Sequence, residues 1–143
     1  MNAYIDTSAL AKCYIREPRS LEVLEWAAAA TKPATAGIAL VEFRCLLARR
    51  RRSSQIDQTL EHRALAEFDS HVRGGAWHIH QSSFGEYAGA RDLIDTLPDL
   101  SLRALDALHL AAAQAIGASD FATADKTQAD AAQALGFTVH RFY

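Results

Sequence analysis

The sequence predicts an α/β fold, a parallel sheet flanked by helices that forms a single domain over residues 1–143. Short apolar segments alternate with longer helix-forming segments along the chain, and this alternation favours parallel strands joined by right-handed helical crossovers. Hydrophobic residues make up 50% of the chain and charged residues 22%, which excludes a disordered chain. A chain of this length can bury a core without metal or disulfide cross-links and leaves little room for a second domain.

The first half of the chain predicts two strands and four helices. The opening strand ends at Asp6, and Thr7 or Ser8 can cap the helix that follows. Pro18 ends this helix, and Gly37 separates the second strand from a helix with an apolar face. The expected strands are 2–5 and 32–36, and the expected helices run to about residue 15 and over 21–30, 38–49 and 54–72.

The second half of the chain predicts three strands and three helices. Pro98, Gly117 and Gly136 mark the ends of the three helices. Because the number of helices is high for so short a chain, we expect two of them, 54–72 and 84–97, to pair as a projecting arm. The expected strands are 77–80, 121–124 and 137–140, and the other expected helices are 102–116 and 127–135.

The cysteines and the lack of long apolar runs predict a cytoplasmic protein. Cys13 and Cys45 lie in apolar, helix-like segments without a Cys-x-x-Cys or Cys/His spacing, so we expect reduced packing residues and no structural zinc site. No apolar run approaches the roughly 18–20 residues that span a bilayer. The amino-terminal residues also lack the pattern of a signal peptide.

A run of arginines is the main basic feature of a slightly acidic chain. The formal net charge is −2, from 15 Lys and Arg against 17 Asp and Glu, which argues against nucleic-acid binding by bulk charge and leaves a local basic patch open. Cations at the end of a helix either complement the helix dipole and raise solubility or contact an RNA backbone. The run consists of Arg49, Arg50, Arg51 and Arg52.

Four acidic side chains occupy positions that suggest a site. Asp6 and Asp125 directly follow predicted strands, and ligands of open parallel sheets bind beyond the carboxyl ends of the strands. Glu42 and Asp106 interrupt the apolar faces of predicted helices, where an unpaired carboxylate is costly to bury. Each strand-end acid could instead cap the helix that follows it.

The two helical acids also have structural alternatives. Glu42 could form an ion pair with Arg103, and Asp106 could bond to His109, one turn further along the same helix. Taken singly, none of the four acids is a strong indicator of function. Four of them at one end of a sheet are harder to explain by capping and pairing alone.

Gathered carboxylates predict a metal site. Like charges remain ionised together only when a cation lies among them. Carboxylate oxygens without thiolate or clustered His ligands favour Mg²⁺, with Mn²⁺ as an alternative. Such a site activates water and stabilises phosphoryl oxygens, so hydrolysis of a phosphodiester bond is the expected reaction.

The acidic segments resemble the four motifs of the PIN-domain family, in order and in spacing. The segment Tyr4–Leu10 resembles the first motif, Val41–Phe43 the second and Phe121–Lys126 the fourth. The segment Leu102–Ala111 is very similar to the third motif, which is the most specific. Together with the length of the chain, this resemblance points to the VapC-type toxins of type II toxin–antitoxin systems.

The resemblance implies a fold, an activity and partners. It implies a Rossmann-like sheet, Mg²⁺-dependent cleavage of RNA to a 5′-phosphate and a 3′-hydroxyl, homodimerisation, and a VapB-type antitoxin that covers the active-site groove. Of the four acids, Asp6 and Asp106 are the ones most expected to bind the metal directly, and Ser8 and Thr123 match polar positions that support the site. The implied acidic quartet is Asp6, Glu42, Asp106 and Asp125.

Two other classes of protein remain alternatives. A receiver-like phosphoacceptor domain also has acids at strand ends, although here only Asp6 follows the first strand and Lys126 directly follows Asp125. A catalytically silent PIN-like domain would act as a binding module, although the quartet is complete. Residues 54–98 carry no recognisable motif, so the sequence does not indicate which RNA is cleaved.

Overall fold

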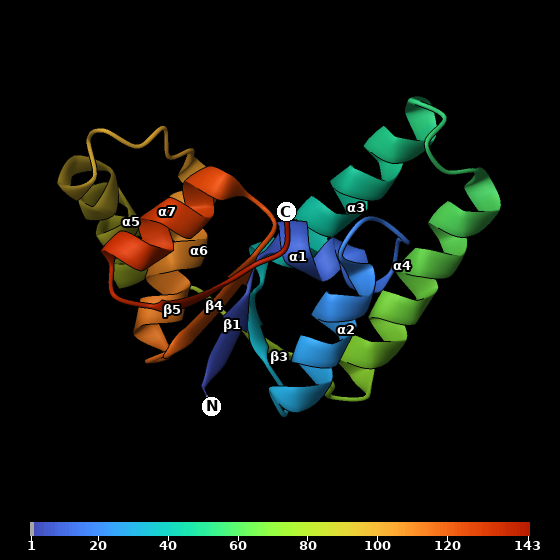
Figure 1. The fold of residues 1–143 in the computed structure, drawn as a ribbon, viewed down its shortest axis with the longest axis horizontal. Helices are drawn as coiled ribbons and strands as arrows, with labels where there is room; N and C mark the ends of the chain where they lie inside the picture. Colours follow the sequence, from blue (N-terminus) through green and yellow to red (C-terminus); the bar gives the residue numbers. More distant parts are fainter. Residues whose placement is uncertain (1) are drawn as a thin grey trace.

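A parallel sheet forms the centre of the molecule (Figure 1). The structure is a computed structural model and describes residues 2–143. The sheet order is β3-β2-β1-β4-β5, with every neighbouring pair parallel, which confirms the predicted fold class. The strands are β1 Ala3–Ile5, β2 Ala34–Ala36, β3 His78–His80, β4 Asp120–Thr123 and β5 Thr138–Arg141.

Helices cover both faces of this sheet, α1 to α4 on one side and α5 to α7 on the other (Figure 1). Each face has its own apolar core: Phe43 and Phe68 lie in the first, and Leu110 and Phe121 lie in the second. The helices are α1 Thr7–Leu10, the 3₁₀ helix η1 Ala11–Cys13, α2 Ser20–Ala29, α3 Ile38–Arg52, α4 Gln58–Arg73, α5 Phe84–Thr96, α6 Ala104–Ala115 and α7 Lys126–Ala134.

The two central strands bring their carboxyl ends together. Tyr4 of β1 is paired with Phe121 of β4, and Ile5 is paired with Ala122. Asp6 therefore leaves the sheet beside Thr123, which ends β4. Residues 3–5 of β1 and 121–123 of β4 are buried because helices cover the sheet on both faces.

The predicted helical arm is formed by different helices. Helix α4 packs against α3, and these two helices project together (Figure 1), whereas α5 packs against α6. The prediction that helices 54–72 and 84–97 would pair is wrong because β3 lies between them in the chain. Strand β3 pairs in parallel with β2, and the crossover that follows it runs over the opposite face of the sheet.

The cysteines differ in environment. Both are free thiols, Cys13 half-buried and Cys45 exposed, so the expectation of a packing residue is wrong for Cys45, which lies on the solvent side of α3. Burial raises the pKa of Cys13 to about 12, and its thiol is therefore protonated at neutral pH. In a separate finding, no helix of residues 2–143 combines the length and the apolar character needed to cross a membrane.

Candidate active site

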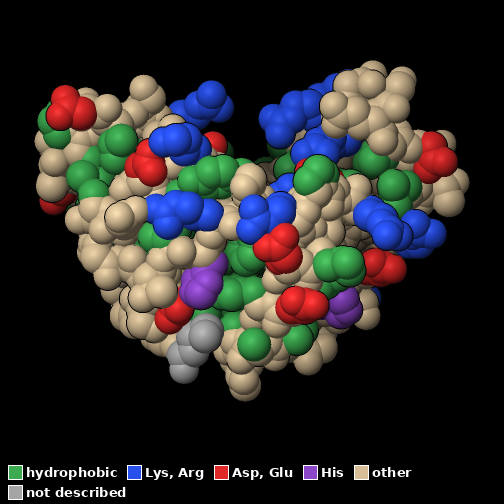
Figure 2. Space-filling model, in the orientation of Figure 1, with side chains coloured by type: hydrophobic (Ala, Val, Ile, Leu, Met, Phe, Trp, Pro, Cys, Tyr) green, Lys and Arg blue, Asp and Glu red, His purple; other side chains and the backbone are tan. Residues whose placement is uncertain are grey.

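A groove of about 780 Å³ runs beside the carboxyl end of β1, between α3 and the start of α6. Glu42 and Asp106 line it from opposite sides of the sheet, and Arg49 and Arg103 lie at the same groove. Figure 2 shows Lys and Arg side chains on both sides of the hollow between the α3–α4 arm and the helices of the other face. The groove thus combines acidic side chains with a basic margin.

Asp6 is the most buried of the four acids, with 4% of its surface exposed. Its Oδ1 caps α1 by accepting from the Ala9 amide at 3.1 Å and also accepts from the Ser8 hydroxyl at 2.6 Å. Its Oδ2 accepts from the Thr123 hydroxyl at 2.5 Å. Burial raises the pKa of Asp6, although nearby His109 and these hydrogen bonds oppose the rise. Asp6, not Thr7 or Ser8, is therefore the cap of α1, and Ser8 and Thr123 hold its carboxylate.

Glu42 is held by polar groups from two other helices. Its Oε1 accepts from the Thr7 hydroxyl at 2.8 Å and lies 2.6 Å from His109 Nε2. Burial disfavours the charge on Glu42, but the bonds to His109 and Thr7 outweigh burial and lower its pKa. The sequence-based pairing of Glu42 with Arg103 is therefore wrong, since His109 occupies that role.

Asp106 and Asp125 stand at the amino-terminal ends of α6 and α7. Asp106 Oδ2 accepts from the Arg103 amide at 3.2 Å, and Asp125 Oδ1 caps α7 by accepting from the Gln128 amide at 2.8 Å. Burial and then the nearby charge of Asp125 raise the pKa of Asp106. The alternative that Asp106 bonds to His109 is wrong, since the ring of His109 contacts Tyr4, Thr7 and Glu42.

Hydrogen bonds connect three of the four acids, Asp6, Asp125 and Asp106. Thr123, which donates to Asp6, also accepts from the Asp125 amide at 3.0 Å. The side chain of Gln128 donates to the Asp106 carbonyl at 3.0 Å. These bonds link Asp6, Asp125 and Asp106 at the carboxyl edge of the sheet, whereas Glu42 belongs to a neighbouring set of hydrogen bonds with Thr7 and His109.

The donor chemistry of this region fits a divalent cation. All four acids offer carboxylate oxygens, the preference of Mg²⁺ and Mn²⁺, and repulsion between Asp106 and Asp125 is what a cation would relieve. Within residues 2–143, however, no three His, Cys, Asp or Glu side chains lie close enough to hold a metal ion as they stand. The fit is therefore one of chemistry and charge, without a preassembled ligand cage.

The four arginines of residues 49–52 have different environments. Arg49 lines the groove, whereas Arg50 forms an ion pair with Glu17 at 2.9 Å and Arg51 forms one with Glu61 at 3.0 Å. Arg52 is exposed at the end of α3. The geometry favours Arg49 as the member of the run that can reach a ligand in the groove.

The sequence did not predict a role at the site for three residues, Tyr4, Thr7 and Gln128. Tyr4 accepts from the Ala36 amide at 3.0 Å and bonds to His109 at 2.6 Å. Gln128 is fully buried, and its position three residues after the cap Asp125 is the capping-box pattern that could have singled it out. Tyr4 and Thr7 carry no comparable local pattern.

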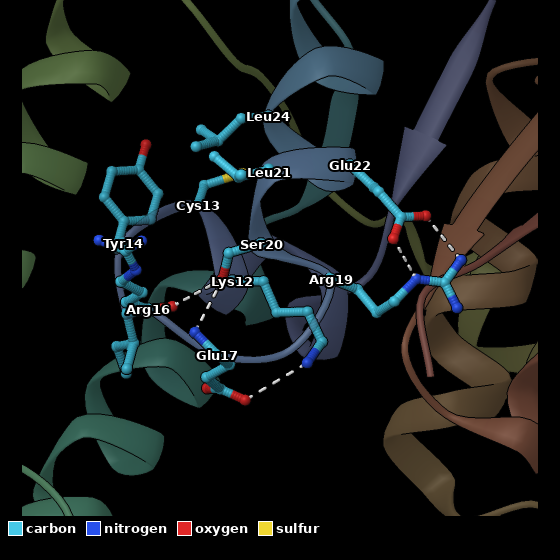
Figure 3. A pocket seen from close by; sticks show the side chains of 11 residues that line it. Lys12, Cys13, Tyr14, Arg16, Glu17, Arg19, Ser20, Leu21, Glu22 and Leu24 are labelled. Atoms are coloured by element: carbon cyan, nitrogen blue, oxygen red, sulfur yellow. Dashed lines mark hydrogen bonds and ion pairs between the residues drawn. The ribbon is translucent and has the colours of Figure 1, made fainter.

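A second cavity lies away from these acids, between η1, the following loop and α2 (Figure 3). Its volume is about 630 Å³. Lys12 pairs with Glu17 at 3.4 Å, and Arg19 pairs with Glu22 at 2.5 Å. Two cations of this cavity are thus paired with neighbouring acids, and its lining includes none of the four candidate acids.

Comparisons with known proteins agree with this geometry. The PIN domain family model matches residues 3–134. No curated protein sequence matches the chain. Among solved structures, the chain is similar to VapC20 of Mycobacterium tuberculosis, described as a toxin that cleaves the sarcin–ricin loop, with 18% identity, a TM-score of 0.72 and coverage of 95% of this chain and 96% of that one. The family match spans almost the whole chain, and the chain belongs to the PIN-domain family.

Proposed function

We propose that the protein is a VapC-type toxin, an endoribonuclease that hydrolyses RNA phosphodiester bonds with Mg²⁺, or Mn²⁺ in its place. The observation that carries the proposal is the meeting of Glu42 and Asp106 in one groove with Arg49 and Arg103. Acidic groups suit a cation, and the arginines suit the phosphates on either side of a scissile bond. The similarity in fold to VapC20, a toxin that cleaves the sarcin–ricin loop, supports RNA as the substrate.

Glu42 and Asp106 line the groove, and Asp6 and Asp125 lie at the same carboxyl edge of the sheet outside its lining. When bound, the divalent cation supplies activation of water and stabilisation of charge on the phosphoryl oxygens. Asp6, Glu42, Asp106 and Asp125 would hold it. Ser8 and Thr123 keep the Asp6 carboxylate in place through their hydroxyls.

A VapB-type antitoxin is the proposed regulatory partner, and a homodimer is the proposed assembly. Val41 and Leu105 line the groove and are 67% and 43% exposed. An apolar segment of an antitoxin that also carries acidic side chains would cover these residues and neutralise the arginines beside them. RNA and antitoxin would therefore compete for the same groove. RNA and antitoxin both occur in the cytoplasm, and we propose that the toxin acts there.

The receiver-like alternative is less compatible with the site. A receiver-like domain carries a pair of acids after its first strand and a free lysine after a later strand, whereas Thr7 follows Asp6 here. Lys126 is paired with Asp130 at 2.8 Å. A small phosphodonor should therefore leave the protein unlabelled.

Removal of divalent cations should abolish cleavage. In EDTA, cleavage of total RNA should stop, and added Mg²⁺ or Mn²⁺ should restore it, with 5′-phosphate and 3′-hydroxyl ends on the fragments. Mapping of these 5′ ends would also identify the target RNA. Cleavage that persists in EDTA would contradict the proposal, and a folded wild-type protein without cleavage would favour the silent binding module.

Arg49→Ala should weaken RNA binding and lower its salt dependence. Loss of one phosphate contact should reduce the slope of log K against log salt by about one. Arg73→Ala is the matched control, because Arg73 is exposed at the end of α4 beside the start of β3, at the opposite edge of the sheet. Titrations with labelled RNA at several salt concentrations measure both variants, and equal slopes for Arg49→Ala and wild type would remove Arg49 from the RNA surface.

A further inference from the structure

His109 connects the two helical layers that supply the acidic side chains. Glu42 belongs to α3 on one face of the sheet, and Asp106 belongs with His109 to α6 on the other. His109 Nε2 lies 2.6 Å from Glu42 Oε1, and only 2% of the residue is exposed. The contact therefore joins the two layers directly, at the edge of the sheet where the groove lies.

Tyr4 and Glu42 contact the two ring nitrogens of His109, and together they indicate its tautomer. The Ala36 amide donates to Tyr4 Oη at 3.0 Å, so this oxygen already accepts one bond from the backbone of β2. Burial raises the pKa of Tyr4 well above its usual value, and the phenol keeps its proton. The Glu42 carboxylate can only accept, so the nitrogen that faces it, His109 Nε2, carries a hydrogen, and in the neutral ring Nδ1 is left to accept from Tyr4 Oη, 2.6 Å away.

The contacts of Glu42 use only one of its two oxygens. Oε1 receives bonds from His109 Nε2 and from the Thr7 hydroxyl, at 2.6 and 2.8 Å. Within residues 2–143, Oε2 has no hydrogen-bond partner, and the side chain of Glu42 lines the groove with 23% of its surface exposed. Restraint of one oxygen therefore leaves the other available to a ligand.

We propose that His109 is a positioning residue that orients the carboxylate of Glu42 and sets its place relative to Asp106. His109 is itself held by Tyr4, whose ring stacks on Phe121 in the middle of the sheet, with centroids 5.3 Å apart. Such partners of metal-binding carboxylates fix ligand orientation without touching the metal. The inference rests on the proposed function, because orientation of Glu42 affects activity only if Glu42 serves the cation.

Two substitutions separate the two nitrogens of the ring. His109→Asn keeps an amide near the position of Nδ1 and loses the donor to Glu42, whereas His109→Gln places an amide near Nε2 and can keep that donor. With Mn²⁺ alone as the calorimetric probe, His109→Asn should bind about ten- to a hundredfold more weakly than wild type. His109→Gln should recover most of that loss. The kcat for RNA cleavage should fall in parallel, while KM for RNA stays unchanged because Arg49 and Arg103 remain.

Melting temperatures and imidazole ¹⁵N spectra complete the test. The wild-type spectrum should show His109 protonated at Nε2 and accepting at Nδ1, and Glu42→Gln should shift the Nε2 signal. A folded His109→Asn that binds Mn²⁺ as tightly as wild type, or equal losses in both His109 variants, would overturn the positioning role. A wild-type protein that binds no Mn²⁺ would refute the proposed function instead. The ¹⁵N spectrum would then test the inference by itself, because a proton on Nδ1 in place of Nε2 of His109 would overturn it.

Discussion

Asp106→Asn is expected to reduce RNA cleavage by about a thousandfold, which corresponds to several kcal/mol of lost transition-state stabilisation. Asn retains an oxygen that can accept from the Arg103 amide, as Asp106 Oδ2 does at 3.2 Å, so the start of α6 should stay intact. The substitution removes the negative charge of Asp106. This charge is disfavoured in the folded protein, because burial and nearby Asp125 raise the pKa of the Asp106 carboxyl group. The variant should therefore melt at the same or a higher temperature than wild type in metal-free buffer.

The same variant should lose the response to metal. Under the proposed function Mg²⁺ should bind only the folded state and raise the melting temperature of wild type, but it should have little effect on Asp106→Asn. Asp69→Asn is the matched control, because Asp69 is exposed on α4 outside the groove, and it should behave as wild type in both assays. Near-normal cleavage by purified Asp106→Asn would exclude Asp106 from the site.

The position of the acids follows from local sequence patterns. Asp6 and Asp125 could be placed at one edge because short apolar segments end at them and parallel strands share a carboxyl edge. The sequence presents capping and ligand binding as alternatives for these two residues. The structure shows that both cap helices, and in each case the cap uses only Oδ1 of the carboxylate.

The contacts between elements could not be predicted in the same way. His109 has Asp106 as its acidic neighbour on α6, yet it bonds to Glu42 and Tyr4, which are 67 and 105 residues away in the chain. Which helix meets which is decided by the side of the sheet on which each crossover runs. The same reason explains why α4 packs on α3 instead of α5.

Asp6→Asn and Asp6→Ala should separate the two roles of Asp6, and both should lose cleavage to the same extent as Asp106→Asn. Asn can still accept from the Ala9 amide, so α1 keeps its cap. Ala leaves this amide and the hydroxyls of Ser8 and Thr123 without their acceptor, at a cost of about 1–3 kcal/mol in the free energy of unfolding. Thermal or denaturant unfolding measures the difference between the two variants.

The pH dependence of unfolding distinguishes the charge of Asp6 from its hydrogen bonds. Because burial raises the pKa of Asp6 above its ordinary value of 3.8, the folded state takes up a proton before the unfolded state does. The cost of the buried charge is therefore present at neutral pH and disappears as the pH falls through the folded pKa toward 3.8. In EDTA, Asp6→Asn should be more stable than wild type at neutral pH, and this advantage should shrink on acidification. An advantage that stays constant with pH would mean that Asp6 carries no destabilising charge in the folded protein.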